Sequence, residues 1–411
     1  MMKNYSYNIL FYILFFLFVF FDELFFFILI LTGTSAEDGM KTLEVVPIAG
    51  ITYAMLVYDI LKERVKGKKL TVLFFLITIV LVYLLTPLFH DGANSRYRSS
   101  LLLILAECVP AAYVGARLAH SSPNAMLKID RLLPFFVIPI SISLGMVGVG
   151  YVGESMLMGE DESGLGYQSM SYFMSYSYAY CAYYVFFSPL KNTKIHRFFR
   201  VIMLPDMFFC ALMCLASGGR GAFVFIILIS IYILYTLRKS MKGHIGYYNL
   251  IIIGVSVAFL MAASYFDIWN SAGMNRIVGS LTDDAERERL YHMAFQAFEE
   301  SPFVGQGLGS IWYTVGYYSH NIVMDLLAET GIVGAFFFVF VLLRTFFTLY
   351  KNIHYNNIFI LFTIIFLGAL IKNSFSGYYL GAYKLFMFCS FAYVLNTFRF
   401  IPKHTNNNSL K

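Results

Sequence analysis

The chain contains 411 residues, of which 59% are apolar, 18% aromatic and only 13% charged, and its mean hydropathy is +0.68. This composition excludes an ordinary soluble domain, in which about a quarter of the residues are charged. The formal net charge of +6 does not indicate nucleic acid as a partner, because Lys and Arg fall in short segments between apolar runs.

Apolar runs of about twenty residues recur along the whole chain, and a run of this length crosses the hydrocarbon core of a bilayer as a helix. We therefore predict an all-α polytopic membrane protein that forms a single integral membrane domain over residues 1–411, with about 12 transmembrane helices. These helices are predicted at residues 8–31, 43–61, 70–88, 101–118, 132–150, 170–188, 198–216, 221–237, 248–266, 321–343, 355–371 and 380–397.

Basic residues are unevenly distributed between the predicted loops. If the N-terminus lies inside, the inner segments hold most of the 30 Lys and Arg residues, as cytoplasmic loops do. Both termini are therefore predicted to be cytoplasmic. The tripeptide Thr34–Ala36 resembles a signal-peptide cleavage site, but the first apolar run is too long for a signal core, so we interpret it as a retained span.

A few thiols and carboxylates interrupt the apolar runs. Buried cysteine behaves as a small apolar residue, and we interpret all five cysteines in this way. Four carboxylates within the predicted spans are expected to pair inside the helix bundle. The cysteines are Cys108, Cys181, Cys210, Cys214 and Cys389, and the carboxylates are Asp22, Glu23, Glu107 and Asp206.

Between the ninth and tenth predicted helices, residues 267–319 form a large loop on the outer side. A connection of this length is commonly functional. Its segment DDAERERLYHMAFQAFEES predicts an amphipathic helix, which Asp283 and Asp284 could cap and which Pro302 ends. Its apolar face is Leu290, Met293, Ala294, Ala297 and Phe298.

A glycine-rich stretch, FVGQGLGS, follows the predicted amphipathic helix. Gly305, Gly307 and Gly309 alternate with other residues, and glycine lowers the barrier to unusual backbone conformations. We expect a flexible turn that rests with the helix on the membrane surface.

The first candidate site is the turn LASGGRGAF between the seventh and eighth predicted helices. Gly218, Gly219 and Gly221 would let the backbone approach a ligand closely. The Arg220 guanidinium and nearby backbone amides would then favour an anion. The alternative is a tight turn whose Arg side chain reaches from the membrane to water.

The second candidate site is the pair Arg287 and Arg289 in AERERLYHM, at the start of the amphipathic helix. Both could bind an anion on the outer face. The alternative is a solvated helix face, because alternating charges are typical of one.

The third candidate site opens the tenth predicted helix. His320 lies where the outer loop re-enters the membrane, and its ordinary pKa near 6.5 suits a general base; alternatively, it is a structural hydrogen-bonding residue. Asp325 and Glu329 lie one turn apart within the apolar run, where carboxylates are costly and usually functional. They could line a polar cavity, hold an imidazole or pair with an outer Arg.

The sequence contains no metal-ligand constellation, phosphate-binding loop or nucleotide fingerprint. We therefore expect neither a metal nor another cofactor. An activated donor would therefore have to arrive in another form, such as a lipid-linked one.

The three sites resemble, in order, signatures of the O-antigen polymerase and O-antigen ligase superfamily. SGGRGAF is similar to its Ser-x-Ser-Arg-Gly-Ala turn, RERLYHMAFQAFEESPFVGQGLG to its Arg-x-x-x-Trp…Pro-x-x-Gly-x-Gly segment, and SHNIVMDLLAETGIVG to its His-Asn…Leu…Glu-x-Gly signature. The similarity covers mainly residues 200–340. Tyr291 replaces the Trp, and Gly219 replaces the second Ser, which weakens Ser217 as a ligand.

The resemblance implies a metal-independent, inverting glycosyltransferase that acts at the outer face of the bacterial inner membrane. Its donor and acceptor would be undecaprenyl-diphosphate-linked glycans, and a chain-length regulator is a further candidate partner. Arg220 and Arg287 would bind the diphosphate, and His320 would deprotonate the acceptor hydroxyl. Arg289 competes with Arg287, although the spacing to Tyr291 favours Arg287. Supporting residues would be Asn321, Asp325, Glu329, Gly219, Gly305 and Gly307.

We predict that the chain polymerises lipid-linked repeat units into O-antigen or capsular polysaccharide. The alternative within the superfamily is a ligase that transfers finished glycan to lipid A-core. An alternative from another class is a proton-coupled transporter with His320, Asp325 and Glu329 as its relay, although the chain lacks the internal repeat common in transporters. A structural membrane scaffold is a third alternative, but it would need no buried carboxylates.

Overall fold

The computed structural model of the chain describes residues 2–32, 40–61, 104–121, 123–150, 167–190, 193–240 and 285–397, with short pieces between 257 and 274. All regular structure in these residues is helical, as predicted. The α-helices are α1 (Met2–Val19), α2 (Phe21–Thr32), α3 (Met40–Leu61), α6 (Val109–Leu118), α7 (Pro123–Gly150), α8 (Tyr167–Phe186), α9 (Lys194–Ser217), α10 (Arg220–Ser240), α13 (Ala285–Glu300), α14 (Ile311–Thr314), α15 (Ile322–Asn352), α16 (Ile358–Phe375) and α17 (Tyr383–Thr397).

Several of these helices are long and apolar enough to cross a membrane. Among the described residues, four helices meet this condition, and a bent helix pair brings the number to five. The chain is therefore a multi-pass helical membrane protein. The predicted span 70–88 and most of 248–266 lie outside the described residues, so the number of twelve spans and the cytoplasmic termini stay predictions. The four helices are α7, α9, α15 and α16.

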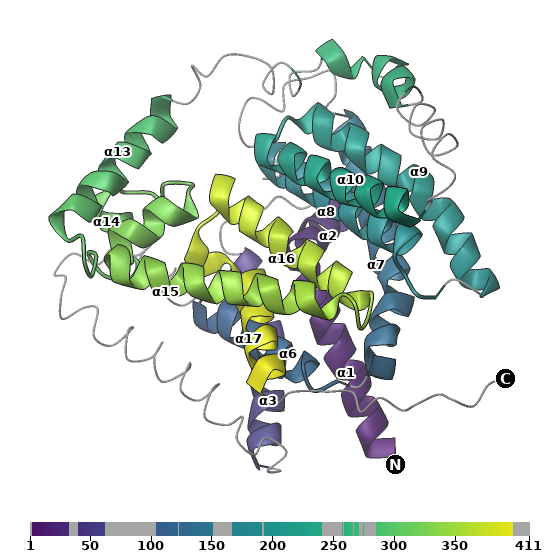
Figure 1. Cartoon of the computed structure of the whole chain (residues 1–411), viewed down its shortest axis with the longest axis horizontal. Helices are drawn as coiled ribbons and strands as arrows, with labels where there is room; N and C mark the ends of the chain where they lie inside the picture. The colour runs from purple at the N-terminus through teal and green to yellow at the C-terminus, as the bar shows by residue number, and fades with distance from the viewer. Residues whose placement is uncertain are drawn as a thin grey trace.

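Helix α8 forms the centre of one half of the molecule. It packs against α7, α9, α10 and α16, and its side chains from Met170 to Tyr184 are buried all around the helix. A helix that is buried on every side has no polar face. This explains why Tyr, Phe, Ser and Met occur all around α8 without an amphipathic pattern. Figure 1 shows α7, α8, α9 and α10 in blue and teal and α16 in yellow-green.

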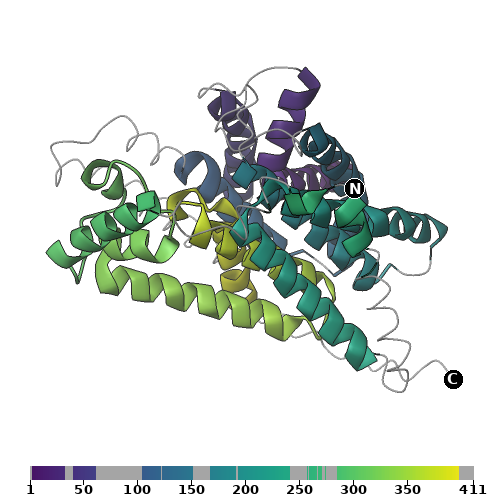
Figure 2. The ribbon, with the colours of Figure 1, turned by 90° about the horizontal axis from the view of Figure 1, so that it is seen from above.

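Helices α13 and α14 lie together at one end of α15, away from the α7–α10 group (Figures 1 and 2). The amphipathic helix predicted in the large loop is confirmed as α13. Leu290, Ala294 and Ala297 of its predicted apolar face are buried, and α13 packs against α15. Asp283 and Asp284 lie outside the described residues. The long loop is therefore anchored on the helix that follows it.

The predicted first span is broken. α1 and α2 meet at an angle of 83°, directly before Asp22 and Glu23. The Lys372 ammonium lies 2.9 Å from Asp22 Oδ2, and the Lys384 ammonium lies 3.3 Å from Glu23 Oε1. Both carboxylates thus face cations, one from the last turn of α16 and one from the first turn of α17, and the predicted pairing within the bundle is confirmed for them.

Asp206 also finds its partners inside the bundle. Ser141 Oγ donates to Asp206 Oδ2 at 2.7 Å, and the Cys181 thiol approaches the same oxygen at 3.4 Å. Burying a carboxylate without such partners would be costly. All five cysteines are free and four of them are buried, as expected for packing residues.

Candidate functional site

Helix α15 is interrupted at Gly331, whose φ of 62° and ψ of −169° are not helical. The two amides that follow leave the helical pattern and bond to the loop after α13. Ile332 N–H donates to Pro302 C=O at 2.9 Å, and Val333 N–H donates to Phe303 C=O at 3.2 Å. A Cβ at Gly331 would collide with the Phe303 backbone. Glycine is therefore required at this position for both conformation and space.

The loop returns hydrogen bonds to the carbonyls that the break sets free. Gln306 N–H donates to Ala328 C=O and Gly307 N–H donates to Glu329 C=O, each at 2.9 Å. Gly305 has a φ of +70°, and a Cβ there would collide with the Glu329 backbone. The glycine-rich stretch is thus docked onto α15 by its backbone. The expectation of a flexible turn is wrong, because pairing between distant backbone segments cannot be read from local glycine content.

The Glu329 carboxylate is fully buried and joins three segments. It accepts from Gly309 N–H at 2.8 Å and from Ile311 N–H at 3.4 Å in the loop. It also accepts from the hydroxyls of Tyr378 and Tyr379, at 2.7 Å and 2.5 Å. These donors satisfy a charge that would otherwise be costly to bury. The structure thus gives Glu329 a role outside the three alternatives, a hydrogen-bonded junction between the loop, α15 and the α16–α17 connection.

Asp325 and Asn321 fix the backbone around His320. Asp325 Oδ1 accepts from Ser319 N–H at 2.8 Å. Asn321 is the N-cap of α15, and its Oδ1 accepts from Val323 N–H at 3.0 Å. The first backbone N–H groups of a helix have no acceptor within the helix, and a side-chain oxygen at the N-cap can accept from them. The residues before and after His320 are thus both held by short hydrogen bonds.

His320 has a φ of +61°, a left-handed conformation that is uncommon outside glycine. Its ring is half-buried and lies 4.5 Å from the Tyr318 ring and 5.4 Å from the Tyr317 ring, centroid to centroid. Strained backbone of this kind persists only where surrounding contacts impose it, and it clusters at functional sites. The surrounding contacts therefore fix the backbone conformation of His320, just before the N-terminal end of α15.

The Arg220 turn is built as the sequence suggested, with a left-handed glycine and tight packing. Gly218 has a φ of 79° and ends α9, and α10 begins at Arg220. Gly219 N–H donates to Ser171 Oγ at 2.8 Å, and this hydroxyl also contacts Ser217 Oγ at 2.8 Å. Ser217 therefore serves the turn itself, in line with the weakened case for it as a ligand.

The two arginines of α13 differ in exposure. Arg287 is half-buried, whereas Arg289 is exposed and its guanidinium donates to Met293 Sδ at 3.3 Å. A half-buried guanidinium loses less mobility when it binds an anion than a fully exposed one. The difference agrees with the preference for Arg287 that the spacing gave.

A pocket of about 270 Å³ lies beside the His320 segment, at the end of α16 and the start of α17. Tyr318, next to His320, lines one side, and Tyr176 of α8 lines another. The Arg220 turn packs nearby on α8 and α16, because a Cβ at Gly221 would touch both Tyr172 and Phe375, the last residue of α16.

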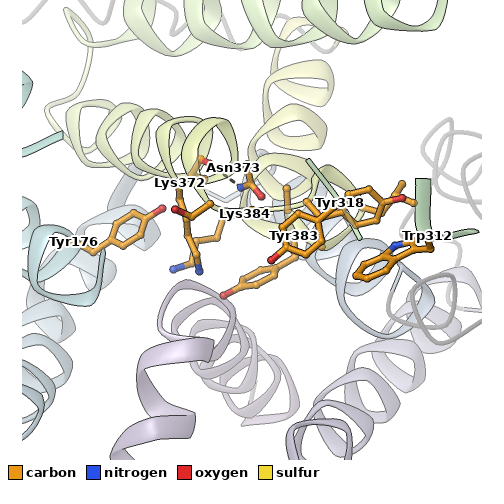
Figure 3. Close-up of a pocket in the computed structure, with 14 residues that line it drawn as sticks. Tyr176, Trp312, Tyr318, Lys372, Asn373, Tyr383 and Lys384 are labelled. Carbon is orange, nitrogen blue, oxygen red and sulfur yellow. Dashed lines mark hydrogen bonds between the residues drawn. The ribbon is translucent and has the colours of Figure 1, made fainter. Parts of the chain in front are cut away.

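Figure 3 shows the side chains of this pocket. The amino groups of Lys372 and Lys384 lie side by side at one end, and the rings of Tyr318 and Trp312 lie at the other. We did not single out any of these four residues in the sequence. The available signal was the pair of carboxylates Asp22 and Glu23 inside the first apolar run, because buried charges require partners.

Burial raises the pKa of the Tyr318 phenol well above its ordinary value, and the nearby Tyr317 and Asp325 raise it further. Burial also raises the pKa of Tyr378, with the Glu329 charge as the next cause. Both phenols therefore stay neutral at physiological pH and keep their protons available for hydrogen bonds.

Comparison with known proteins finds a family model that matches one segment of the chain. Residues 207–339 match the family model Wzy_C, described as O-antigen ligase. This segment includes the Arg220 turn, α13, the docked loop and the His320 end of α15. A search of curated proteins finds no match. The Wzy_C domain is shared by O-antigen ligases and polymerases, which are glycan-transferring enzymes. Residues 207–339 of the chain are therefore similar to the domain that O-antigen ligases and polymerases share.

Proposed function

We propose that the chain is a polymerase that joins undecaprenyl-diphosphate-linked repeat units into O-antigen or capsular polysaccharide at the outer face of the bacterial inner membrane. The observation that carries this proposal is the setting of His320. The residue sits in an imposed left-handed conformation between Ser319, which Asp325 holds, and Asn321, which caps α15. Its ring packs against Tyr318, which lines a pocket together with Tyr176, Lys372 and Lys384.

In the proposed reaction, the acceptor hydroxyl attacks the anomeric carbon of the donor glycan. The new glycosidic C–O bond forms as the bond to the diphosphate oxygen breaks, which inverts the anomeric centre. His320 takes the proton of the hydroxyl, a general-base contribution worth roughly 10²–10⁴-fold. The electron pair leaves with undecaprenyl diphosphate, and Arg220 and Arg287 stabilise its growing negative charge. Arg289, which is exposed, stays the second choice for this role.

No metal is required in this proposal. Diphosphate is a stable leaving group, and two guanidinium groups can supply the positive charge that a divalent cation would otherwise bring. Gly219 supports the turn through Ser171, while Gly305 and Gly307 support His320 indirectly by docking the loop on α15.

Two other functions are weaker proposals. A ligase would use the same residues with lipid A-core as acceptor, and the experiment below separates it from a polymerase. A proton-coupled transporter would need Glu329 to exchange protons during transport. The four hydrogen bonds that Glu329 accepts from loop amides and tyrosines support a structural role for this carboxylate instead.

The test is the glycan banding pattern of cells that carry His320→Ala or Arg220→Ala at the normal expression level, beside the deletion strain and His292→Ala. His292 is exposed on α13 and serves as the histidine control. A polymerase predicts single-repeat glycan instead of a ladder in the deletion, His320→Ala and Arg220→Ala strains, and a normal ladder with His292→Ala.

Two results would change the proposal. Loss of surface ladders with accumulation of lipid-linked polymer would identify a ligase. An unchanged ladder with His320→Ala would show that His320 is not the general base and would favour the transporter.

A further inference from the structure

The pocket between Lys372 and Trp312 is built for a ligand with one polar and one apolar side. Lys372 and Lys384 present ammonium groups at one end, and Trp312 and Tyr318 present rings at the other (Figure 3). Sugar rings combine hydroxyl oxygens with apolar C–H faces that pack on aromatic rings. A volume of about 270 Å³ lies near the lower end of small-molecule sites, about 300–1,000 Å³, so the pocket can take one ring.

The lysines are held in place by carboxylates that do not line the pocket. Among the residues that the structure describes, Lys372 donates one hydrogen bond, to Asp22, and its side chain keeps 29% exposure. Lys384 bonds to Glu23 and lies 4.4 Å from the centre of the Tyr176 ring. An ammonium group carries three N–H donors. Lys372 in particular retains donors that can point to a ligand oxygen.

The surrounding charges disfavour an anionic ligand. Asp22 and Glu23 balance the two lysines, and Glu107 lies behind the Tyr383 ring in an adjoining small cavity. An additional carboxylate or phosphate would therefore enter a site whose positive charge is already compensated. Neutral hydroxyl or acetamido oxygens can accept from lysine without this penalty.

We propose that this pocket binds one neutral sugar ring of the glycan substrate, next to the hydroxyl that His320 activates. Tyr318 connects the two places, because it lines the pocket and packs against the His320 ring. Lys372 donates to a sugar oxygen, and Trp312 packs on the ring face. This inference rests on the proposed function for the identity of the substrate, but the binding itself can be tested without transfer.

Gly381 offers a way to fill the pocket without touching its ion pairs. It lines the pocket, and a Cβ there would meet nothing within 4 Å. Gly50 in α3 has the same free space and lies outside the pocket, so Gly50→Leu is the matched control for Gly381→Leu. Lys372→Met removes the donor and keeps the length of the side chain.

Binding is measured by Trp312 fluorescence in the full-length protein in nanodiscs. The chain has two tryptophans, Trp269 and Trp312, so Trp269→Phe leaves Trp312 as the single reporter. The probe is the host's repeat-unit oligosaccharide, released from its lipid carrier by mild acid. We expect a saturable change that Gly50→Leu keeps, that Gly381→Leu abolishes, and that Lys372→Met weakens about tenfold, the loss typical of one hydrogen bond from a charged donor.

Salt distinguishes neutral from acidic sugars. A response that is constant between low and high salt supports hydroxyl recognition, whereas a response that falls steeply with salt overturns the neutral-sugar assignment. No fluorescence change at any oligosaccharide concentration, or equal responses in Gly381→Leu and Gly50→Leu, would overturn the subsite.

The same variants separate this inference from the proposed function. If lipid-linked units are extended but Gly381→Leu has a normal KM, the function stands and the subsite is wrong. If the wild-type protein binds the oligosaccharide but extends nothing, the subsite stands and the polymerase assignment is wrong. His320→Ala is expected to lose extension and to keep the fluorescence response.

Discussion

The two parts of α15 on either side of Gly331 form one apolar run in the sequence but have opposite surroundings. Before the break, Asp325, Leu326, Ala328 and Glu329 are buried against the docked loop and the α16–α17 connection. After the break, large apolar side chains are mainly exposed: Ile332, Val333, Phe336, Phe337, Val339, Phe340, Val341, Leu343 and Phe347.

This difference explains how one helix can carry carboxylates and still fit a membrane. α15 has 31 residues and at about 1.5 Å per residue exceeds the roughly 30 Å hydrocarbon core. The part after Gly331 is long enough to cross it alone. The first part can therefore be a polar-lined scaffold for His320, covered by protein, while the second part faces lipid.

The largest effect is expected from Glu329→Ala, which would leave four donors without their acceptor. Each buried donor left unsatisfied costs about 1–3 kcal/mol, so the docked loop should detach or the protein should fail to fold. Thermal unfolding in nanodiscs, with protease cleavage within residues 302–319 as a second readout, measures the change. Glu299→Ala, at an exposed position of α13, is the control and should unfold like the wild type. Equal behaviour of the two variants would contradict the junction.

The next largest effect is expected from Gly331→Ala. The alanine must adopt a backbone conformation that only glycine visits readily, and its Cβ must displace the Phe303 backbone. The substitution should therefore lower the unfolding free energy by about 3 kcal/mol. Gly316→Ala has a positive φ of +84° but open space around its Cβ, so it should cost about 1–2 kcal/mol. A smaller loss at Gly331 than at Gly316 would show that the break is not imposed by the loop.

Asp325 should affect glycan transfer more than stability. Asp325→Ala removes the acceptor of Ser319 N–H and should misplace His320, with a loss of about 10- to 100-fold in kcat. Asp325→Asn keeps an oxygen that can accept the same bond and should retain most of the activity. The measurement is kcat and KM for lipid-linked units. Equal losses in both variants would indicate that the negative charge, not the hydrogen bond, is needed.

The smallest effect is expected in the lipid-facing part. Phe336→Leu should change neither unfolding nor transfer, because Phe336 is 65% exposed and both side chains suit lipid. A spin label at residue 336 should collide with oxygen dissolved in the bilayer more than with a water-soluble nickel reagent. The reverse preference would place this part of α15 outside the hydrocarbon core.

The sequence predicted the features that depend on local pattern. Apolar length gave the membrane class, the spacing of Leu290, Ala294 and Ala297 gave α13, and the glycines around Arg220 gave the turn. Interactions between distant segments were not accessible in this way. The pairing of Asp22 with Lys372 spans 350 residues, and no local pattern specifies it.

The same limit explains the errors near His320. Gly305 was expected in a flexible turn, but it fits against the Glu329 backbone, and Gly331 fits against the Phe303 backbone. Glu329 was singled out correctly as unusual, yet two of its four partners, Tyr378 and Tyr379, lie in a connection for which the sequence indicated no role. The roles of Arg220, Arg287, Arg289 and His320 in catalysis stay predictions.

The most direct test of the account is extension of purified lipid-linked repeat units by the full-length protein in nanodiscs, with EDTA present and no membrane potential. The account predicts longer glycans and free undecaprenyl diphosphate from the wild type and from His292→Ala, with a rate at least ~100-fold lower for folded His320→Ala. Undiminished extension by His320→Ala would contradict the assignment of His320 as the base, and absence of product from the wild type would contradict the polymerase itself.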